Sequence, residues 1–302
     1  MERLKGLTLG ESIEEFERHL AQRPVALNTR KAFVGDLRIF ARHLLPKTAE
    51  LSGSDLPLSG ITTDHIKSFI SAQERDSGAK NPKSVERRLT SLKVFFKWLQ
   101  ERGVLATDPA DRIAYKPLLD PLPEYLTEDQ ARAIVKAARM IAVGERLEAR
   151  PLTVIMLVLQ TGIKKSECLA LTAADIERGE QDTALIWIHY AQKHLQFKDR
   201  RLPITTECLQ VIDSHIRRYT IQDKLFDCTG RNLEYMFNRK VAPLAGLDCL
   251  TFEMLRWTCA VREFRSGQFT SEQMQVKYGL SEVGWLEMQA KLERLVRSSD
   301  NA

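Results

Sequence analysis

Three prolines within nine residues divide this chain of 302 residues. They lie in the segment Tyr115-Lys116-Pro117-Leu118-Leu119-Asp120-Pro121-Leu122-Pro123. Each proline lacks a backbone donor and disfavours helix at the residue before it. Because neither a long helix nor a central strand can run through such a segment, we predict two domains, residues 1–114 and 124–302, joined by a linker at 115–123. The chain is long enough for each domain to bury its own core.

The composition excludes several classes of protein. Apolar residues make up 43% of the chain and charged residues 28%, which is typical of a globular protein. No apolar run approaches the roughly 18 residues that cross a bilayer, and the N-terminus lacks the apolar core of a secretory signal. We therefore expect a cytoplasmic protein with no membrane partner. The five cysteines show no C-x-x-C spacing, so we expect small buried core residues.

The net charge of +5 comes entirely from residues 1–116, which hold 20 Lys and Arg against 15 Asp and Glu. Apolar spacing predicts helices in this half near residues 10–22, 28–45, from Thr63 onward, and 82–100, with Asn28 and Thr63 as the caps of the second and third. The last helix has a core stripe of Val85, Leu89, Leu92, Phe96 and Leu99. Its opposite side carries Lys80, Lys83, Arg87 and Lys97, which is either a solvated face or a phosphate-binding face.

The second half combines helices with a hairpin. Helices are predicted near residues 127–142, 151–161, 206–219, 232–245, 251–266, 271–277 and 282–297, and a turn or short helix at 164–171. The first has a capped start at Thr127, and the helix at 151–161 is expected to be buried. A strand at 183–190 is expected to pair with one at 200–204. The fold class is therefore mainly α with a small β-sheet: a helical N-terminal domain and an α+β C-terminal domain.

An ordered series of motifs along the chain is typical of one protein family. It includes Thr29-Arg30-Lys31-Ala32-Phe33, then Ser84-Val85-Glu86-Arg87-Arg88-Leu89, Asp108-Pro109-Ala110 and Leu159-Gln160-Thr161-Gly162-Ile163-Lys164. From about residue 8 to residue 296, the chain resembles the tyrosine recombinase (phage-integrase) family. The resemblance implies a SAM-like core-binding domain and a catalytic-type domain that together clamp duplex DNA, with no metal or cofactor. It makes the following residues expected DNA contacts: Arg30, Lys31, Lys80, Lys83, Arg87, Lys97, Lys164, Lys193, Lys198, Arg200 and Arg256.

In that family a tyrosine hydroxyl attacks a DNA phosphodiester, and two arginines meet the charge that develops on the phosphate. Lys164 stands at the position of the first arginine and lacks its planar, two-donor fork. Arg256 keeps the second position. The family's hairpin lysine matches either Lys193 or Lys198.

The other expected catalytic positions are altered as well. Glu253 replaces a histidine, and a carboxylate about 4 Å from a phosphate oxygen repels it by about 4 kcal/mol at an effective dielectric of 20, unless it pairs with Arg256 instead. Leu280 replaces a second histidine, and Gln289 falls near the nucleophile's position. No tyrosine follows Tyr278, which is either a half-buried core residue or a displaced nucleophile.

These substitutions favour a DNA-binding protein that clamps duplex DNA without cutting it, as an accessory, regulatory or architectural factor in recombination or mobile-element integration. One alternative is an active recombinase that uses Tyr278 or a tyrosine supplied in trans. Another is a protein-interaction module without DNA. Partners could include an active recombinase or further copies of the chain, through the helix at 282–297. Its apolar residues Trp285, Met288, Leu292 and Leu295 would dock on a neighbour or on their own domain.

Overall fold

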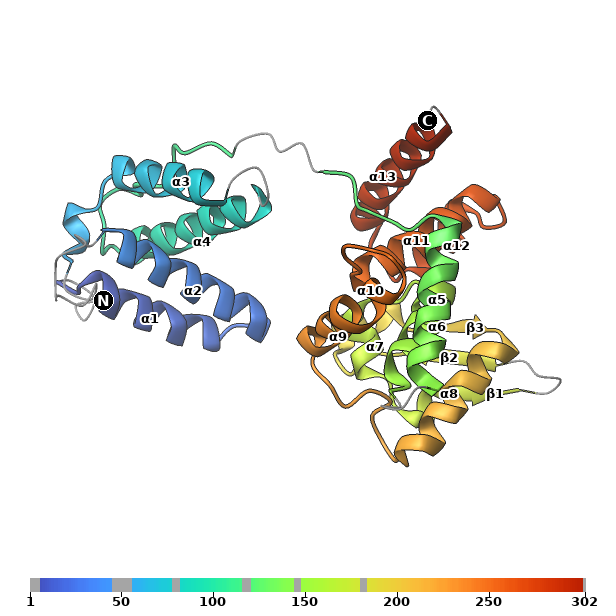
Figure 1. Cartoon of the computed structure of the whole chain (residues 1–302). Coiled ribbons are helices and arrows are strands. Elements are labelled where there is room, and N and C mark those ends of the chain that lie inside the picture. Colours follow the sequence, from blue (N-terminus) through green and yellow to red (C-terminus); the bar gives the residue numbers. More distant parts are fainter. Residues whose placement is uncertain are drawn as a thin grey trace. The chain divides into compact units, whose positions relative to one another are not determined.

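The computed structural model describes residues 6–44, 56–77, 82–115, 121–143, 148–179 and 184–300. The chain forms two compact units, Met1–Asp120 and Pro121–Ala302. The division falls inside the proline-rich segment, of which residues 116–120 lie outside the described part, as does Lys80. Figure 1 shows helices in both units and a small sheet in the second. The chain is thus mainly α-helical with one three-stranded sheet among its described residues, as predicted.

The N-terminal unit (Met1–Asp120) contains α1 (Leu9–Ala21), α2 (Leu27–Leu44), α3 (Thr63–Ser77) and α4 (Pro82–Glu101). The predicted stripe on α4 is confirmed, because none of its five residues is more than 8% exposed. Phe95 and Trp98 are buried as well, and their rings contact Phe16 of α1 at centroid distances of 5.4 and 5.2 Å. The apolar face of α4 is therefore wider than one stripe, since α4 packs against α2 and α3 as well as these α1 contacts.

Two details at the helix starts differ from the prediction. Asn28, expected to cap α2, lies inside that helix, which begins at Leu27. Thr63, expected to cap α3, is its first residue, and the side chain of Thr62 accepts the backbone N–H of His65 at 3.5 Å. The Thr63 hydroxyl instead donates to the Pro109 carbonyl at 2.8 Å. At the start of α3 the sequence could not show which residue is the cap, because Thr62 and Thr63 are adjacent threonines.

A buried carboxylate joins α2 to α4. The Asp36 side chain is 2% exposed, and its Oδ2 accepts from Arg87 Nη1 at 2.5 Å and from the Ser91 hydroxyl at 2.8 Å. The Arg88 Nε lies 3.8 Å from Oδ1. A carboxylate buried to this degree is tolerated because several donors replace its water.

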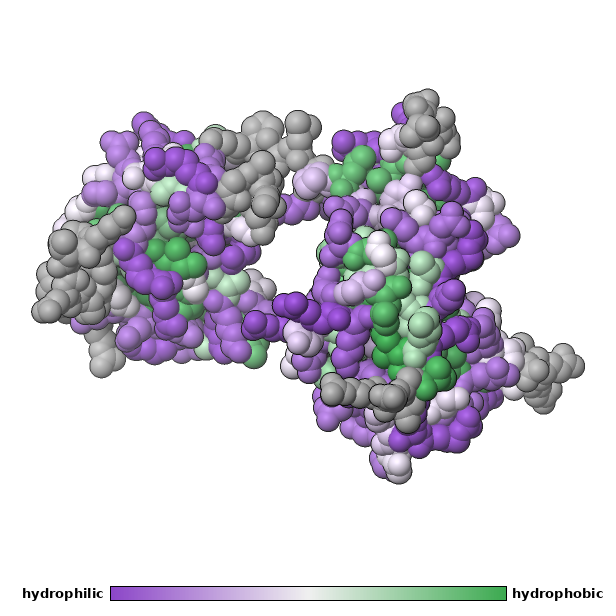
Figure 2. Space-filling model, in the orientation of Figure 1, coloured by the Kyte–Doolittle hydropathy of each residue, from purple (hydrophilic) through white to green (hydrophobic). Residues whose placement is uncertain are grey.

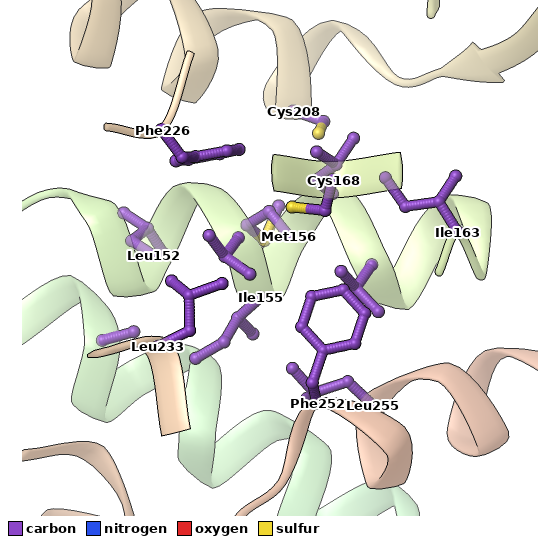
Figure 3. Close-up of a cluster of buried hydrophobic side chains, with 14 of the residues drawn as sticks. Leu152, Ile155, Met156, Ile163, Cys168, Cys208, Phe226, Leu233, Phe252 and Leu255 are labelled. Atoms are coloured by element: carbon purple, nitrogen blue, oxygen red, sulfur yellow. The ribbon is translucent and has the colours of Figure 1, made fainter. Parts of the chain in front are cut away.

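The C-terminal unit (Pro121–Ala302) is built around α6 (Arg150–Thr161), which contacts α5 (Glu128–Val143), α8 (Thr206–Tyr219) and α11 (Phe252–Ser266). Every residue from Pro151 to Val158 is buried, so α6 is a buried helix, as predicted. Figure 3 shows the side chains that pack there: Leu152, Ile155, Met156, Ile163, Cys168, Cys208, Phe226, Leu233, Phe252 and Leu255.

The sheet has the order β1-β2-β3, with β1 at Ile176–Arg178, β2 at Ala184–Ile188 and β3 at Arg200–Ile204. Both pairings are antiparallel, which confirms the predicted hairpin. Ile186 lies opposite Ile176 on one side and Leu202 on the other, so one face of the sheet joins the core. Sequence reasoning missed β1 because three residues are too few to show a period of two.

The remaining helices close the unit. They are α7 (Lys165–Ala170), α9 (Gly230–Met236), a π-helical turn at Phe237–Val241, α10 (Ala242–Leu244), α12 (Ser271–Lys277) and α13 (Glu282–Asp300). The single helix predicted at 232–245 is thus irregular, and Pro243, which has no N–H to donate, lies at the irregularity.

The surface of both units is mostly polar, with an apolar strip on the visible face of the C-terminal unit (Figure 2). In the described ranges no helix is both long and apolar enough to cross a membrane. Cys168, Cys208 and Cys259 are buried as expected, and Cys228 is partly buried. Cys249 is exposed, so the prediction was wrong there: it lies between Asp248 and Leu250 in the loop before α11, where no element covers it.

We expect Asp36→Ala to lower the free energy of unfolding by about 2 kcal/mol, because the mostly buried Arg88 would keep its charge without a carboxylate. Urea denaturation followed by tryptophan fluorescence measures the change. Asp111→Ala removes an exposed carboxylate of the same unit and serves as the matched control, with an expected loss below about 0.5 kcal/mol. Equal effects of the two substitutions would contradict a structural role for Asp36.

Candidate functional site

Two glycine turns lie close together in the C-terminal unit, one after α6 and one after α12. Gly162 has φ +61° and Gly279 has φ +57°, both in the left-handed region that favours glycine. A Cβ at Gly162 would lie 2.4 Å from Cε1 of Tyr278, and one at Gly279 would lie 2.7 Å from Nη1 of Arg200. Both turns therefore need glycine for space as well as for conformation. The candidate site is built on these two turns.

Lys164 follows the first turn and makes contacts within the protein. Its Nζ donates to the Gly279 carbonyl at 2.9 Å and lies 3.8 Å from Oε1 of Glu167. Its backbone N–H donates to Oε2 of Glu167 at 2.8 Å, at the start of α7. Burial lowers the pKa of Lys164, and the charges of Arg256, Lys198 and Arg200 lower it further, against the attraction of Glu167. The ammonium group therefore ties the two glycine turns together.

Arg200 forms a buried ion pair with Glu167. The two side chains are 3% and 2% exposed, and Nη2 and Nη1 of Arg200 donate to the two carboxylate oxygens at 2.8 and 3.2 Å. Arg200 Nε also donates to the Lys277 carbonyl at 2.6 Å. The donors of Arg200, which was expected to contact DNA, are therefore used inside the domain.

The same carboxylate also holds the end of the β2–β3 connection. The Tyr190 hydroxyl donates to Oε1 of Glu167. Burial alone would raise the pKa of Glu167, but the hydrogen bonds and charge of Arg200 outweigh it, so the pKa lies below its usual value. Burial and the neighbouring Glu167 raise the pKa of Tyr190 to about 12. Tyr190 therefore stays protonated and acts as a donor at neutral pH.

Arg256, on α11, retains contact with the first glycine turn. Its Nε donates to the Gly162 carbonyl at 3.0 Å, and its guanidinium lies 5.7 Å from the Tyr278 ring centroid. Nη1 of Arg256 lies 3.6 Å from Oε2 of Glu253. Of the two outcomes expected for Glu253, repulsion of a phosphate or pairing with Arg256, the structure thus contains the ion pair. Glu253 is 57% exposed and Arg256 only 11%. Nη2 of Arg256 is buried and has no hydrogen-bond partner in the described part of the chain.

Tyr278 is fully buried, where the sequence predicted half burial or a displaced nucleophile. It is 0% exposed, and its hydroxyl donates to Oε2 of Glu263 at 2.9 Å and contacts Sγ of Cys259 at 3.4 Å. Lys277 pairs with Glu263 and donates to the Gln160 carbonyl at 3.2 Å. Burial raises the pKa of Tyr278 well above its ordinary value, as do Cys259 and Glu263. This hydroxyl is neither exposed nor activated.

The remaining expected positions lie in the packing of α12 and α13. Leu280 packs against a cluster that includes Tyr278 and Trp285. Gln289 bonds within the C-terminal unit, to Glu293 at 3.2 Å and Ser271 at 3.4 Å. The four apolar residues of α13 are each at most 5% exposed in this unit's own core, so this helix packs on its own domain.

The connection between β2 and β3 forms a 3-10 helix at Lys193–Lys198. Lys193 is exposed and Lys198 is partly exposed, and Lys198 is near enough to Lys164 to lower its pKa. Sequence reasoning passed over Phe197, whose ring is 68% exposed and lies 5.2 Å from Nζ of Lys198. The adjacent lysines were the signal that could have drawn attention to it.

The basic residues of the N-terminal unit take up different environments. Lys31, Lys83 and Lys97 are exposed and Arg30 is partly exposed. Arg87 is 44% exposed, and one of its guanidinium nitrogens forms an ion pair with Asp36. The three described basic residues on the side of α4 opposite the core, Lys83, Arg87 and Lys97, are thus all exposed.

Residues 13–103 match the family model described as phage integrase, N-terminal SAM-like domain. The chain is 32% identical over 167 residues to tyrosine recombinase XerC of Mycobacterium leprae (strain TN), a match that spans 55% of this chain and 53% of that protein. The chain thus aligns with about half the length of the curated relatives it matches. The chain is therefore similar to tyrosine recombinases over the aligned part, and residues 13–103 carry the SAM-like domain.

Solved structures agree on the fold. The crystal structure of a lambda integrase dimer bound to a COC′ core site matches with a TM-score of 0.70 and 18% identity, over 94% of this chain and 78% of that one. The Tn1549 transposon integrase in complex with transposon right end DNA matches with a TM-score of 0.70 and 18% identity, over 96% of this chain and 100% of that one. At this identity the likeness shows the shared fold.

We expect Glu167→Gln to lower the free energy of unfolding by about 3 kcal/mol, because it leaves the buried Arg200 without a charged partner. Glu177→Gln is the matched control: it breaks the exposed pair with Arg201, in which Nε lies 2.8 Å from Oε2, and should cost under about 1 kcal/mol. Urea denaturation compares the two variants. Similar losses of unfolding free energy in the two variants would show that the buried pair stabilises the fold no more than the exposed pair does.

Gly162→Ala tests the contact between the two turns. We expect it to cost about 3 kcal/mol, because the new Cβ adds a clash with the Tyr278 ring to the left-handed strain. Gly267→Ala is the control, since Gly267 has φ +62° and no atom within 4 Å of the position that a Cβ would take, so only strain of about 1 kcal/mol remains. Thermal unfolding measures both, and equal losses would argue against close packing of Tyr278 on Gly162.

Proposed function

We propose that this chain belongs to the tyrosine recombinase/integrase family and holds duplex DNA without cleaving it. It would act as an accessory, regulatory or architectural factor in recombination or mobile-element integration, beside an active recombinase or further copies of itself. The observation that carries the proposal is the state of Tyr278, which is fully buried with its hydroxyl on Glu263. No tyrosine follows it in the sequence.

Strand cleavage by this family's chemistry requires an exposed tyrosine hydroxyl and donors that meet the phosphate charge. Arg256 already has Glu253 as an ion-pair partner, and a carboxylate beside the phosphate would oppose the developing negative charge. Lys164 donates to the Gly279 carbonyl and has no two-donor fork. Leu280 and Gln289 supply neither an imidazole nor a phenol. These features support the loss of cleavage.

DNA binding is supported by the exposed cations and by the relatives. The lambda and Tn1549 integrases that share this fold were solved in complex with DNA. In this chain, Lys31 and Lys97 of the N-terminal unit and Lys193 of the C-terminal unit are exposed and available to phosphates. Contacts of this kind give affinity by releasing counterions, so they weaken as salt rises.

The alternative is an active recombinase that uses Tyr278 or a tyrosine from a partner molecule. The observation that favours it is the set of relatives described as tyrosine recombinases. It requires either that Tyr278 leave its buried position, breaking its bond to Glu263, or that a second protein complete the site. A protein-interaction role without DNA remains the third hypothesis.

The salt dependence of binding to a short duplex tests the proposal by gel shift. We expect log affinity to fall linearly with log salt concentration, with a slope of about 0.9 for each phosphate contact. The double variant Lys97→Gln, Lys193→Gln should reduce the slope by about 2. Lys136→Gln removes an exposed lysine of α5 outside the predicted contacts and should leave the slope unchanged. Absence of any shift at low salt would contradict DNA binding.

A further inference from the structure

Phe197 is an exposed aromatic side chain in the basic connection between β2 and β3. It belongs to the 3-10 helix Lys193–Lys198 between β2 and β3, and its side chain is 68% exposed. A single exposed apolar residue is common on protein surfaces and needs no function by itself. The neighbours of Phe197 therefore decide whether it has one.

Those neighbours are cationic or polar. Lys193 and His194 are exposed on the same short helix, and Nζ of Lys198 lies 5.2 Å from the centroid of the Phe197 ring. The acidic residue of the connection, Asp199, is already engaged, because its Oδ1 accepts the backbone N–H of Tyr190 at 2.9 Å. An aromatic ring among cations is the combination that binds nucleic acid with exposed bases: the charges meet phosphates and the ring stacks on a base.

The connection is also held in place. Backbone bonds from Leu195 to Gln192 at 2.8 Å and from Asp199 to Gln196 at 2.9 Å close its two turns. Arg200, the next residue, is locked to the buried Glu167. Because the Phe197 ring is carried by a fixed segment, the chain would lose little conformational entropy when the ring stacks on a base. Nη1 of Arg200 also donates to the Lys198 carbonyl at 3.1 Å, so this segment lies beside the candidate site.

We propose that Phe197 stacks on a nucleobase that is unpaired or unstacked in the bound DNA. The inference rests on the proposed DNA-binding function and adds the chemical group that the connection recognises. A base that is already unpaired needs no energy to open, so the protein should prefer duplexes with a local defect over fully paired ones. The stacking is independent of base sequence because every base has a π face.

The test uses the full chain and two short duplexes of equal length, one fully paired and one with a single bulged 2-aminopurine nucleotide, with the bulge moved along the duplex in a series. Wild type should bind the best bulged duplex roughly tenfold more tightly than the paired one, as a stacked base supplies, and should quench the 2-aminopurine fluorescence. Phe197→Tyr keeps the ring and should keep both effects. Phe197→Ala should lose both while its affinity for the paired duplex stays unchanged.

Leu286→Ala is the matched control, because it removes an exposed apolar side chain (59%) from α13, and it should behave as wild type. Circular dichroism shows that each variant is folded. If Phe197→Ala keeps the preference and the quenching, the stacking role is wrong although DNA binding stands. If wild type binds the paired duplex but shows no preference for any bulge, the inference also fails alone. If wild type binds neither duplex, the proposed function fails and the inference with it.

Discussion

The buried ion pair between Glu167 and Arg200 is the interaction on which the candidate site depends. It fixes the start of α7 to the first residue of β3, and its two partners reach three further segments. Glu167 accepts from the Lys164 backbone and from the Tyr190 hydroxyl, and Arg200 donates to the Lys277 carbonyl. Burial of two charges costs free energy, which the pair offsets here because both carboxylate oxygens have donors. The pair thus links the start of α7, both ends of the β2–β3 connection and the end of α12.

Most polar groups of the candidate site have their partners within the protein, with Nη2 of Arg256 as an exception. Lys164 and Arg256 each donate to the carbonyl of a glycine turn, Arg256 also pairs with Glu253, and the Tyr278 hydroxyl donates to Glu263. In the function proposed for this chain, positions that would meet a phosphate in an active relative hold the fold together instead. Of the predicted DNA contacts, the exposed ones lie on the β2–β3 connection and on the helices of the N-terminal unit, which suits retention of DNA more than its cleavage.

Local regularity made much of the fold predictable. The stripe on α4, the hairpin of β2 and β3 and the capping of α5 by Thr127, whose hydroxyl accepts from Gln130 N at 3.3 Å, follow from spacing and residue type. The candidate site was less predictable because its contacts are long-range. Arg200 was expected to contact DNA, and nothing near it in the sequence indicates its partner 33 residues earlier. Likewise, the burial of Tyr278 depends on Gly162, which belongs to a distant turn.

Covalent trapping tests the central claim most directly. A duplex nicked close to the cleavage position releases a short strand on attack, so any tyrosine recombinase reaction accumulates a protein–DNA adduct that survives denaturing electrophoresis. The claim predicts that wild-type protein binds this duplex and forms no adduct, and that Tyr278→Phe behaves identically. An adduct with wild-type protein would contradict it, and loss of that adduct in Tyr278→Phe would identify Tyr278 as the nucleophile.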